Sequence, residues 1–302
     1  MKHGDAMPVC AIGATLGEGP IWLPSDNALW FVDIKKQRLH RYNPEGDARL
    51  ESWAAPAQPG WIVPTVDGRY LCGLQTGLHH FDPASGAFTL FAEVEPDLPG
   101  NRLNDATVDC RGRLWFGSMD DDERAPSGRF YRADGHGIAA VIDGVVITNG
   151  PAVSPDGTLL YHTDTLRRTI HVSRIGPDGT LCDTRLFVAF DPEEGHPDGP
   201  TVDAEGCLWT ALWGGWSARR YAPAGELLQT VRFPVANVTK IALGGPDGRT
   251  AYATTASKGL GKADRAAQPH AGDLFAFEAE VPGQSICLAK PIGPEPKHST
   301  RS

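Results

Sequence analysis

Residues 111–118, RGRLWFGS, contain a turn, then apolar residues, then a small or polar stop. The Arg-Gly pair here replaces the Asp-Gly found in most related segments, and the glycine supplies the positive φ of a tight hairpin turn. The aliphatic and aromatic residues that follow are typical of a short β-strand. This unit therefore predicts a turn that opens a strand.

The unit recurs along the chain and aligns without gaps. Its six copies are DNALWFVD from Asp26, DGRYLCGL from Asp67, RGRLWFGS from Arg111, DGTLLYHT from Asp156, EGCLWTAL from Glu205 and DGRTAYAT from Asp247. Successive copies begin 41 to 49 residues apart. A repeat of roughly 40–45 residues built from short strands is typical of a propeller blade. We therefore expect an all-β fold, a six-bladed β-propeller, because a β-sandwich would not require six in-register copies.

The composition is compatible with one large β domain. Apolar residues make up 41% of the 302 residues, enough for a core, and 35 glycines with 25 prolines imply many turns. We expect residues 1–289 to form a single propeller domain, in which the segment around residues 9–11 adds a strand to the last blade. The polar, Pro-rich tail, residues 290–302, is expected to be poorly ordered.

Several classes of partner and site are disfavoured. The net charge is -9 and no block of five basic residues occurs, which argues against nucleic acid. The sequence has no run of eighteen apolar residues and no signal-like start, which argues against a membrane partner and against secretion. The six cysteines have irregular spacing without a CxxC pair, which favours free thiols. We expect a cytoplasmic protein, a monomer or weak homo-oligomer.

A polar residue interrupts most of the predicted inner strands just upstream of the repeated turn. It lies seven positions before the turn marker in the later repeats and eight before it in the first. The six positions hold Glu18, Gly60, Asn104, Asn149, Asp198 and Lys240. Because equivalent positions in a ring of blades converge at one end of the axis, the polar members should meet at the mouth of the central channel.

Two of these converging side chains are carboxylates, which repel each other unless a proton or a cation intervenes. Glu18 and Asp198, with the amide oxygen of Asn149, form a hard oxygen set suited to one divalent cation. Each of the three precedes a glycine, which permits close backbone approach. A single Asn-Gly or Asp-Gly pair would indicate only a turn. The prediction of a metal site therefore rests on the equivalent positions of the three residues within their repeats. The sequence leaves the identity of the metal open among Ca, Zn, Mg, Mn and Fe(II).

Motifs around these positions resemble a known family. They are LGEGPIW, NRLNDATVDCRGRLWFGSMD, ITNGPAVSPDG, YHTDT, PDGPTVDAEGCLWTALWGG and VTKIALGGPDG. As a set they are similar to the gluconolactonase, senescence-marker-protein and luciferin-regenerating-enzyme-like family of propellers, with a pattern nearest to bacterial xylonolactonases and arabinonolactonases. The resemblance implies hydrolysis of a small-molecule sugar lactone, a pentonolactone or gluconolactone, to the aldonic acid.

The resemblance also implies roles for individual residues. A divalent metal would be held by the two carboxylates and the amide already singled out. Substrate contacts are implied for Arg102, Asn104 and Asp122. Asp122 lies within a run of acidic residues, so Asp121 and Glu123 remain alternatives.

The chemistry predicted for lactone hydrolysis assigns Asp198 two roles, metal binding and general-base catalysis. Trp213 and Trp216 are either a pocket wall or packing residues, and Lys240 either pairs with Glu18 or extends to solvent. Two other functions stay open: another ester or organophosphate hydrolase on the same fold, and a non-enzymatic propeller that binds a ligand or partner. A binding ring has no reason to collect carboxylates and amides on its axis.

Overall fold

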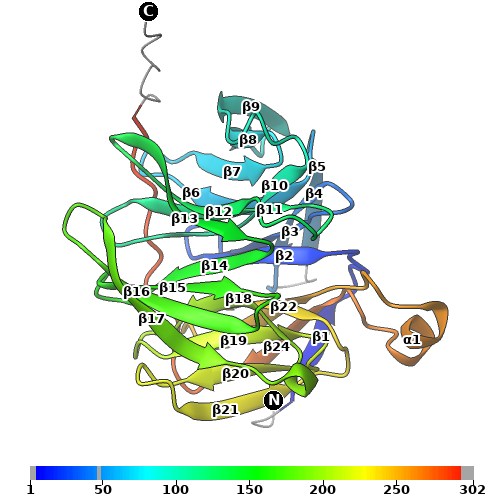
Figure 1. The fold of residues 1–302 in the computed structure, drawn as a ribbon. Helices are drawn as coiled ribbons and strands as arrows, with labels where there is room; N and C mark the ends of the chain where they lie inside the picture. Colours follow the sequence, from blue (N-terminus) through cyan, green and yellow to red (C-terminus); the bar gives the residue numbers. More distant parts are fainter. Residues whose placement is uncertain (1–4, 46–48, 294–302) are drawn as a thin grey trace, which may run out of the picture.

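The computed structural model describes residues 5–45 and 49–293, and these residues form an all-β, propeller-like fold (Figure 1). The prediction of an all-β propeller is confirmed. Helix is confined, in the described residues, to α1 (Lys262–Ala267), which projects from the side of the sheets, and a short 3-10 turn at Pro192–Glu194. No helix in these ranges is long and apolar enough to cross a membrane.

Four sheets have four strands each, in chain order from the inside outward. The first contains β2 (Gly17–Leu23), β3 (Ala28–Asp33), β4 (Arg38–Asn43) and β5 (Arg49–Ala54). The second contains β6 (Pro59–Pro64), β7 (Tyr70–Leu74), β8 (Gly77–Asp82) and β9 (Ala87–Ala92). The third contains β10 (Asn101–Val108), β11 (Leu114–Asp120), β12 (Gly128–Asp134) and β13 (Gly137–Val145). The fourth contains β14 (Thr148–Val153), β15 (Leu159–Asp164), β16 (Thr169–Ile175) and β17 (Leu181–Ala189).

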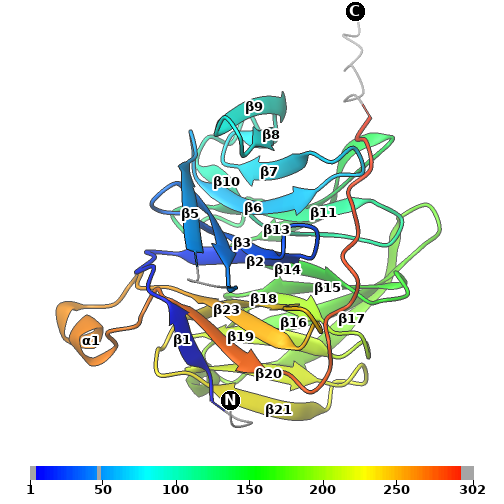
Figure 2. The ribbon, with the colours of Figure 1, turned by 180° about the vertical axis from the view of Figure 1, so that it is seen from behind.

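The fifth sheet has eight strands in the order β1-β24-β23-β22-β18-β19-β20-β21. They are β18 (His196–Val202), β19 (Leu208–Trp213), β20 (Ser217–Tyr221), β21 (Leu227–Arg232), β22 (Val238–Gly244), β23 (Thr250–Thr255), β24 (Leu274–Glu278) and β1 (Met7–Cys10). One parallel pairing, Gly199 with Lys240, joins its two halves. The expected closing strand is confirmed: β1 pairs with β24, beside which it lies in Figure 2.

The repeated turn lies between the first and second strands of each four-stranded unit, as its sequence predicts. Tryptophan occupies the fourth position after the turn marker in three copies, at Trp30, Trp115 and Trp209, each about 1% exposed. The core lies between neighbouring sheets; for example, Trp30 shares a cluster with Ile62 and Leu74 of the next sheet. Apolar burial thus holds the sheets together side by side and leaves the axis to other groups.

The innermost strands lose their regular register near their first residues. The shifts fall between Glu18 and Ile21, between Leu103 and Ala106, between Asn149 and Ala152, and between Pro197 and Pro200. Such bulges re-aim side chains and are frequent beside active sites. Gly19 has φ +55°, and a Cβ there would lie 2.5 Å from the Gly60 carbonyl oxygen, so close approach to the next sheet requires glycine.

The C-terminal strap, residues 282–293, crosses one end of the axis after β24 (Figure 2). Its backbone carbonyl at Pro282 accepts from Ala204, and its N–H at Ala289 donates to Pro64 across the ring. Lys290 and Gly293 continue these contacts, with their N–H groups bonded to the third sheet. Contact with the propeller therefore extends beyond residue 289, while the rest of the predicted tail, residues 294–302, lies outside the described residues.

Candidate functional site

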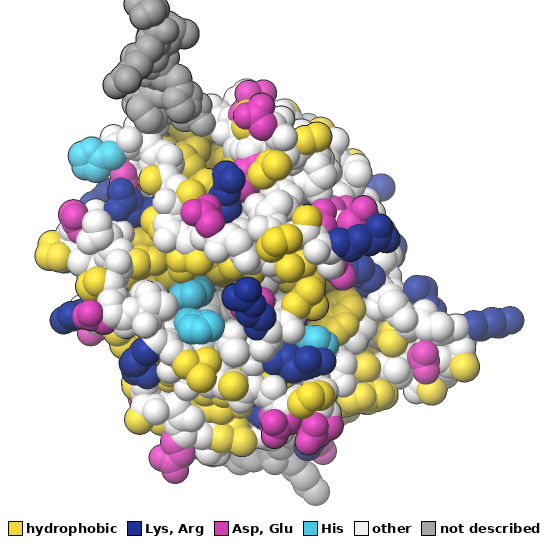
Figure 3. All heavy atoms as spheres, in the orientation of Figure 1, with side chains coloured by type: hydrophobic (Ala, Val, Ile, Leu, Met, Phe, Trp, Pro, Cys, Tyr) yellow, Lys and Arg dark blue, Asp and Glu magenta, His cyan; other side chains and the backbone are white. Residues whose placement is uncertain are grey.

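A pocket of about 330 Å³ opens at one end of the axis, where the innermost strands begin. The predicted residues that line it are Glu18, Arg102, Asn104, Asn149 and Asp198. They come from β2, β10, β14 and β18, four strands that are far apart in sequence. Four of the five side chains expected to converge from their repeat positions are therefore in one pocket, and only Lys240 does not line it. Figure 3 shows one face of the molecule, on which acidic and basic side chains are interspersed around a band of apolar ones.

The two carboxylates of the pocket are buried, with Glu18 3% and Asp198 5% exposed. Burial, and next the charge of Asp105, raises the pKa of Glu18 to about 8. Burial, and next the charge of Glu18, raises the pKa of Asp198 well above its ordinary value. Asp105 therefore opposes ionisation of Glu18, and Glu18 opposes ionisation of Asp198; a divalent cation beside these carboxylates would relieve that conflict.

The amide of Asn149 is held in a fixed orientation beside these carboxylates. Its Nδ2 donates to the Thr165 hydroxyl at 2.9 Å, and that hydroxyl donates to the Pro197 carbonyl at 3.0 Å. The Asn149 Oδ1 is thereby left as an acceptor, contacted by Asn104 Nδ2 at 3.1 Å. Two carboxylates and one amide oxygen fit a hard divalent ion. Within the described residues no group of three or more His, Cys, Asp or Glu side chains could hold a metal, so a metal here would need the amide as a further ligand.

Arg102 and Asn104, the two predicted substrate contacts, lie beside this oxygen set. Arg102 is 3% exposed, and its Nη1 donates to Asn104 Oδ1 at 2.6 Å. Its Nε donates to Asp121 Oδ1 at 2.7 Å. A buried guanidinium with a carboxylate partner retains its charge and its fork of donors for a ligand.

The three acidic residues Asp121, Asp122 and Glu123 lie in different places. Asp122, the substrate contact that the resemblance implied, is exposed and does not line the pocket. Glu123 does line it and forms an ion pair with Lys258, another lining residue. The loop after β11 therefore presents Glu123 to the pocket, while Asp121 contacts Arg102.

Lys240 also differs from its predicted alternatives. Its Nζ lies 2.5 Å from Asp105 Oδ1, so it neither pairs with Glu18 nor extends to solvent. Asp105 is 1% exposed and also accepts the Gly150 N–H at 3.0 Å. Asp105 was not predicted from the sequence, although a carboxylate directly after Asn104 in an inner strand was a signal that could have found it.

The two tryptophans and two of the histidines differ in whether they line the pocket. Trp213 lines the pocket, whereas Trp216 is 42% exposed and does not. His196 lines it too; its Nδ1 contacts a backbone carbonyl at 3.1 Å and its Nε2 lies 3.1 Å from Arg168 Nη2. His162 is buried outside the pocket, and burial lowers its pKa to about 3. All six cysteines are unpaired.

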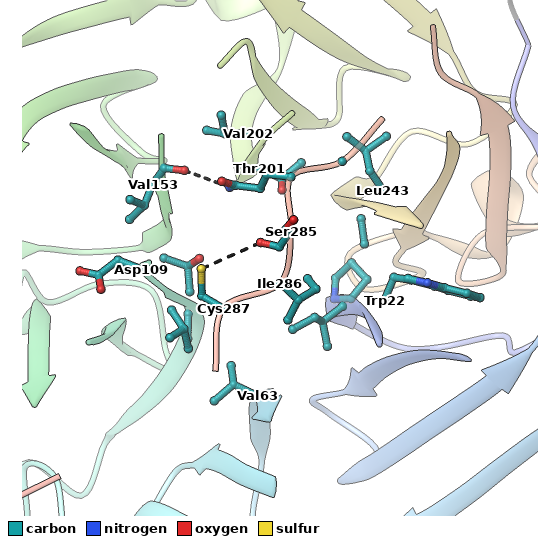
Figure 4. Close-up of a pocket in the computed structure, with 18 of the residues that line it drawn as sticks. Trp22, Val63, Asp109, Val153, Thr201, Val202, Leu243, Ser285, Ile286 and Cys287 are labelled. Atoms are coloured by element: carbon teal, nitrogen blue, oxygen red, sulfur yellow. Dashed lines mark hydrogen bonds between the residues drawn. The ribbon is translucent and has the colours of Figure 1, made fainter. Parts of the chain in front are cut away.

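A second cavity, of about 440 Å³, lies at the opposite end of the axis. It is lined by the later residues of the same inner strands and by Ser285, Ile286 and Cys287 of the C-terminal strap, which passes through the middle of Figure 4. Asp105 and Lys240 line it as an ion pair. Although this cavity is larger, the unpaired carboxylates lie in the other one.

Comparison with known proteins identifies the family of this chain. Residues 16–257 match the model of the SMP-30/Gluconolactonase/LRE-like region. L-arabinolactonase of Azospirillum brasilense is 38% identical over 287 residues, which cover 93% of this chain and 94% of that protein. A pentonolactonase of Haloferax volcanii is 33% identical over 89% of this chain and 92% of its own. The crystal structure of a calcium-binding regucalcin from Agrobacterium tumefaciens superposes with a TM-score of 0.91 at 29% identity, covering 95% of this chain and 98% of that one. The chain belongs to the SMP-30/gluconolactonase/LRE-like family.

Proposed function

We propose that this protein hydrolyses a sugar lactone, a pentonolactone in the first instance, to the aldonic acid. The observation that carries the proposal is the pair of buried carboxylates, Glu18 and Asp198, beside the fixed amide of Asn149. Two relatives that match about nine-tenths of the chain are named for this chemistry, one as an L-arabinolactonase and one as a pentonolactonase.

One divalent metal ion is part of the proposal, with Glu18, Asn149 and Asp198 as its protein ligands. When bound, such an ion acts as a Lewis acid toward the lactone carbonyl oxygen. The solved regucalcin with the same fold is described as calcium-binding, which supports a divalent ion and leaves its identity to experiment.

Asp198 is proposed as the base. As water adds to the lactone carbonyl, a proton has to leave the water, and the ring oxygen gains a proton when the carbon–oxygen bond breaks. The Asp198 carboxylate could bind the ion through one oxygen and accept the proton from water through the other. It would then return that proton to the leaving ring oxygen.

The remaining polar side chains are proposed to hold the lactone. Arg102 offers a planar fork of donors, and Glu123 offers an acceptor for sugar hydroxyls. Leu16, Ile147 and Trp213 line the same pocket and provide an apolar wall for the C–H face of a sugar ring. A pocket of about 330 Å³ accommodates a single-ring lactone.

We also propose that the ring has six blades, with the eight-stranded sheet counted as two. Each half, β18 to β21 and β22 to β24 plus β1, has four strands in antiparallel order like the other sheets. The inner strands β18 and β22 are linked by the parallel pairing of Gly199 with Lys240, and isolated bridges join Trp213 with Asn237 and Asp5 with Arg232. These links are sparse beside the continuous pairing within each half.

The experiment that tests the function is a substrate and metal screen. The protein is stripped with EDTA and assayed in a pH-stat against arabinono-, xylono-, galactono- and gluconolactones, with Ca, Mg, Mn, Zn and Fe(II) restored one at a time. Hydrolysis that disappears on stripping and returns with one or more ions is expected. A phosphotriester and an aryl ester in the same screen test the alternative hydrolases. Failure to hydrolyse any lactone with any ion would overturn the proposal.

A further inference from the structure

Asp121 accepts hydrogen bonds from three side chains that belong to three different sheets. Lys35 Nζ lies 2.6 Å and Arg102 Nε 2.7 Å from Oδ1, while Gln58 Nε2 lies 2.9 Å from Oδ2. Lys35 follows β3 and Gln58 precedes β6, whereas Arg102 is in β10. Asp121 therefore links three sheets next to Arg102, which lines the pocket, and is more than a solvated loop residue.

Asp121 is ionised, as a carboxylate that accepts hydrogen bonds from two cationic side chains should be. Burial on its own would raise the pKa of Asp121, but the hydrogen bonds from Gln58 and Lys35 and the charge of Arg102 lower it to about 2. The carboxylate is therefore ionised throughout the neutral range, and its bonds to the two cations are charge-assisted.

Of the three hydrogen-bond partners of Asp121, Arg102 is the predicted substrate contact, and its side chain is only 2% exposed. The guanidinium donates from Nε to Asp121 and from Nη1 to Asn104 Oδ1 and the Leu103 carbonyl. Asn104 in turn donates to Asn149 Oδ1. Asp121 thus begins a chain of hydrogen bonds that runs through the predicted substrate contacts to a predicted metal ligand. Removing it would leave a buried guanidinium without its carboxylate.

We infer that Asp121 is a positioning residue, which fixes the guanidinium plane of Arg102 so that the remaining donors of Arg102 face a lactone in the pocket. This inference rests on the proposed function. It gives three neighbouring acidic residues different roles, since Asp121 orients Arg102, Asp122 is exposed to solvent and Glu123 lines the pocket.

The test is a double-mutant cycle on lactone hydrolysis. A hydrogen bond to a charged group is worth about 1.5–3 kcal/mol, so Asp121→Ala should raise KM by about 10- to 100-fold while kcat changes little. Because Asp121 acts through Arg102, the double variant Asp121→Ala/Arg102→Ala should be no worse than Arg102→Ala. Multiplied effects of the two substitutions would overturn the inference.

Two further variants separate positioning from general stability. Asp121→Asn keeps an acceptor and should recover part of the lost affinity. Glu51→Ala is the matched control, because the half-exposed Glu51 carboxylate pairs with Arg41 at 3.0 Å on outer strands, far from the pocket. It should leave KM unchanged. A rise in KM for the Glu51 variant equal to that for Asp121→Ala would mean that any lost ion pair has this effect, and would overturn the inference.

A measurement without any lactone keeps this inference distinct from the proposed function. In nitrogen-15 NMR spectra the Nε–H signal of Arg102, assigned by its loss in Arg102→Ala, should exchange slowly with solvent. It should exchange much faster or disappear in Asp121→Ala and persist in Glu51→Ala. That result supports the positioning role even if no lactone is hydrolysed. An unchanged Arg102 signal in Asp121→Ala would overturn it.

Discussion

The two ends of the axis are built from the same inner strands and differ in charge balance. At the covered end, Lys240 lies 2.5 Å from Asp105, and Arg113 lies 2.6 Å from Asp109. At the open end, neither Glu18 nor Asp198 has an ion-pair partner among the described residues. The larger cavity is at the balanced end. Cavity size therefore does not distinguish the two ends, whereas the buried carboxylates without an ion-pair partner make the open end the candidate site.

The largest effect is expected from Asp198→Asn at the open end. This variant keeps an oxygen ligand but loses the charge and the base, so kcat should fall by at least ~10²-fold with saturating metal. Glu18→Gln is the comparison: it should act through weaker metal binding, and excess metal should restore part of its activity. Steady-state kinetics across a metal titration measures both. Near wild-type turnover in metal-saturated Asp198→Asn would remove Asp198 as the base.

A smaller effect is expected at the pocket rim, from Glu123→Gln. Loss of a charged acceptor for a sugar hydroxyl should raise KM by about 10-fold, with little change in metal affinity. The matched control is Asp122→Asn, because Asp122 is adjacent and exposed. Its KM should equal that of the wild type. If the Asp122 variant were the impaired one, Asp122 rather than Glu123 would be the substrate contact.

The charge imbalance also predicts how pH affects the metal-free protein. The pKa of Glu18 is raised to about 8 in the fold, so the native state holds a proton that the unfolded chain releases above its ordinary pKa. Such a carboxyl contributes stability that is complete below the unfolded pKa and is lost as pH rises through the folded one. In EDTA, Tm should fall by a few degrees (~2–5 °C) between pH 5 and pH 8.

Saturating divalent metal should flatten this pH dependence, since the ion replaces the proton. Glu18→Gln should reduce it, because the amide does not titrate while the buried Asp198 still does. Differential scanning fluorimetry at several pH values measures it. A metal-free Tm that rises across the same window would contradict the assignment.

The smallest effect on turnover is expected at the covered end. Ala289 of the C-terminal strap is 1% exposed and packs in a cluster with Val63 and Leu71. Ala289→Glu would bury an unpaired charge and should lower the free energy of unfolding by about 1–3 kcal/mol, with kcat and KM within twofold. Urea unfolding and lactone kinetics measure the two quantities. Leu288→Glu, at a 44% exposed neighbour, is the control and should change neither. If Ala289→Glu lost turnover while its free energy of unfolding stayed unchanged, the strap end of the axis would contribute to activity at the opposite end.

The parts of the molecule that follow from local sequence were predictable. The turn of each repeat depends on a few adjacent residues, and its phase placed Glu18, Asn149 and Asp198 in one pocket. Contacts between distant segments were not. Lys240 and Asp105 are 135 residues apart, and nothing local in either sequence identifies the partner. Glu123 could not be distinguished from Asp122, because a loop has no fixed period that decides which side chain points inward.

The antiparallel pair of β1 and β24 brings residues 7–10 and 274–278 into one sheet. Two segments far apart in the sequence thus complete a single element. During synthesis β1 has no partner until β24 has left the ribosome, whereas the four-stranded sheets between them can form earlier. Pairing across so great a sequence separation is slow, because the loop-closure entropy is lost before the contacts form. A change near residue 7 therefore acts on a late step of folding, although this segment is made before the sheet that it joins.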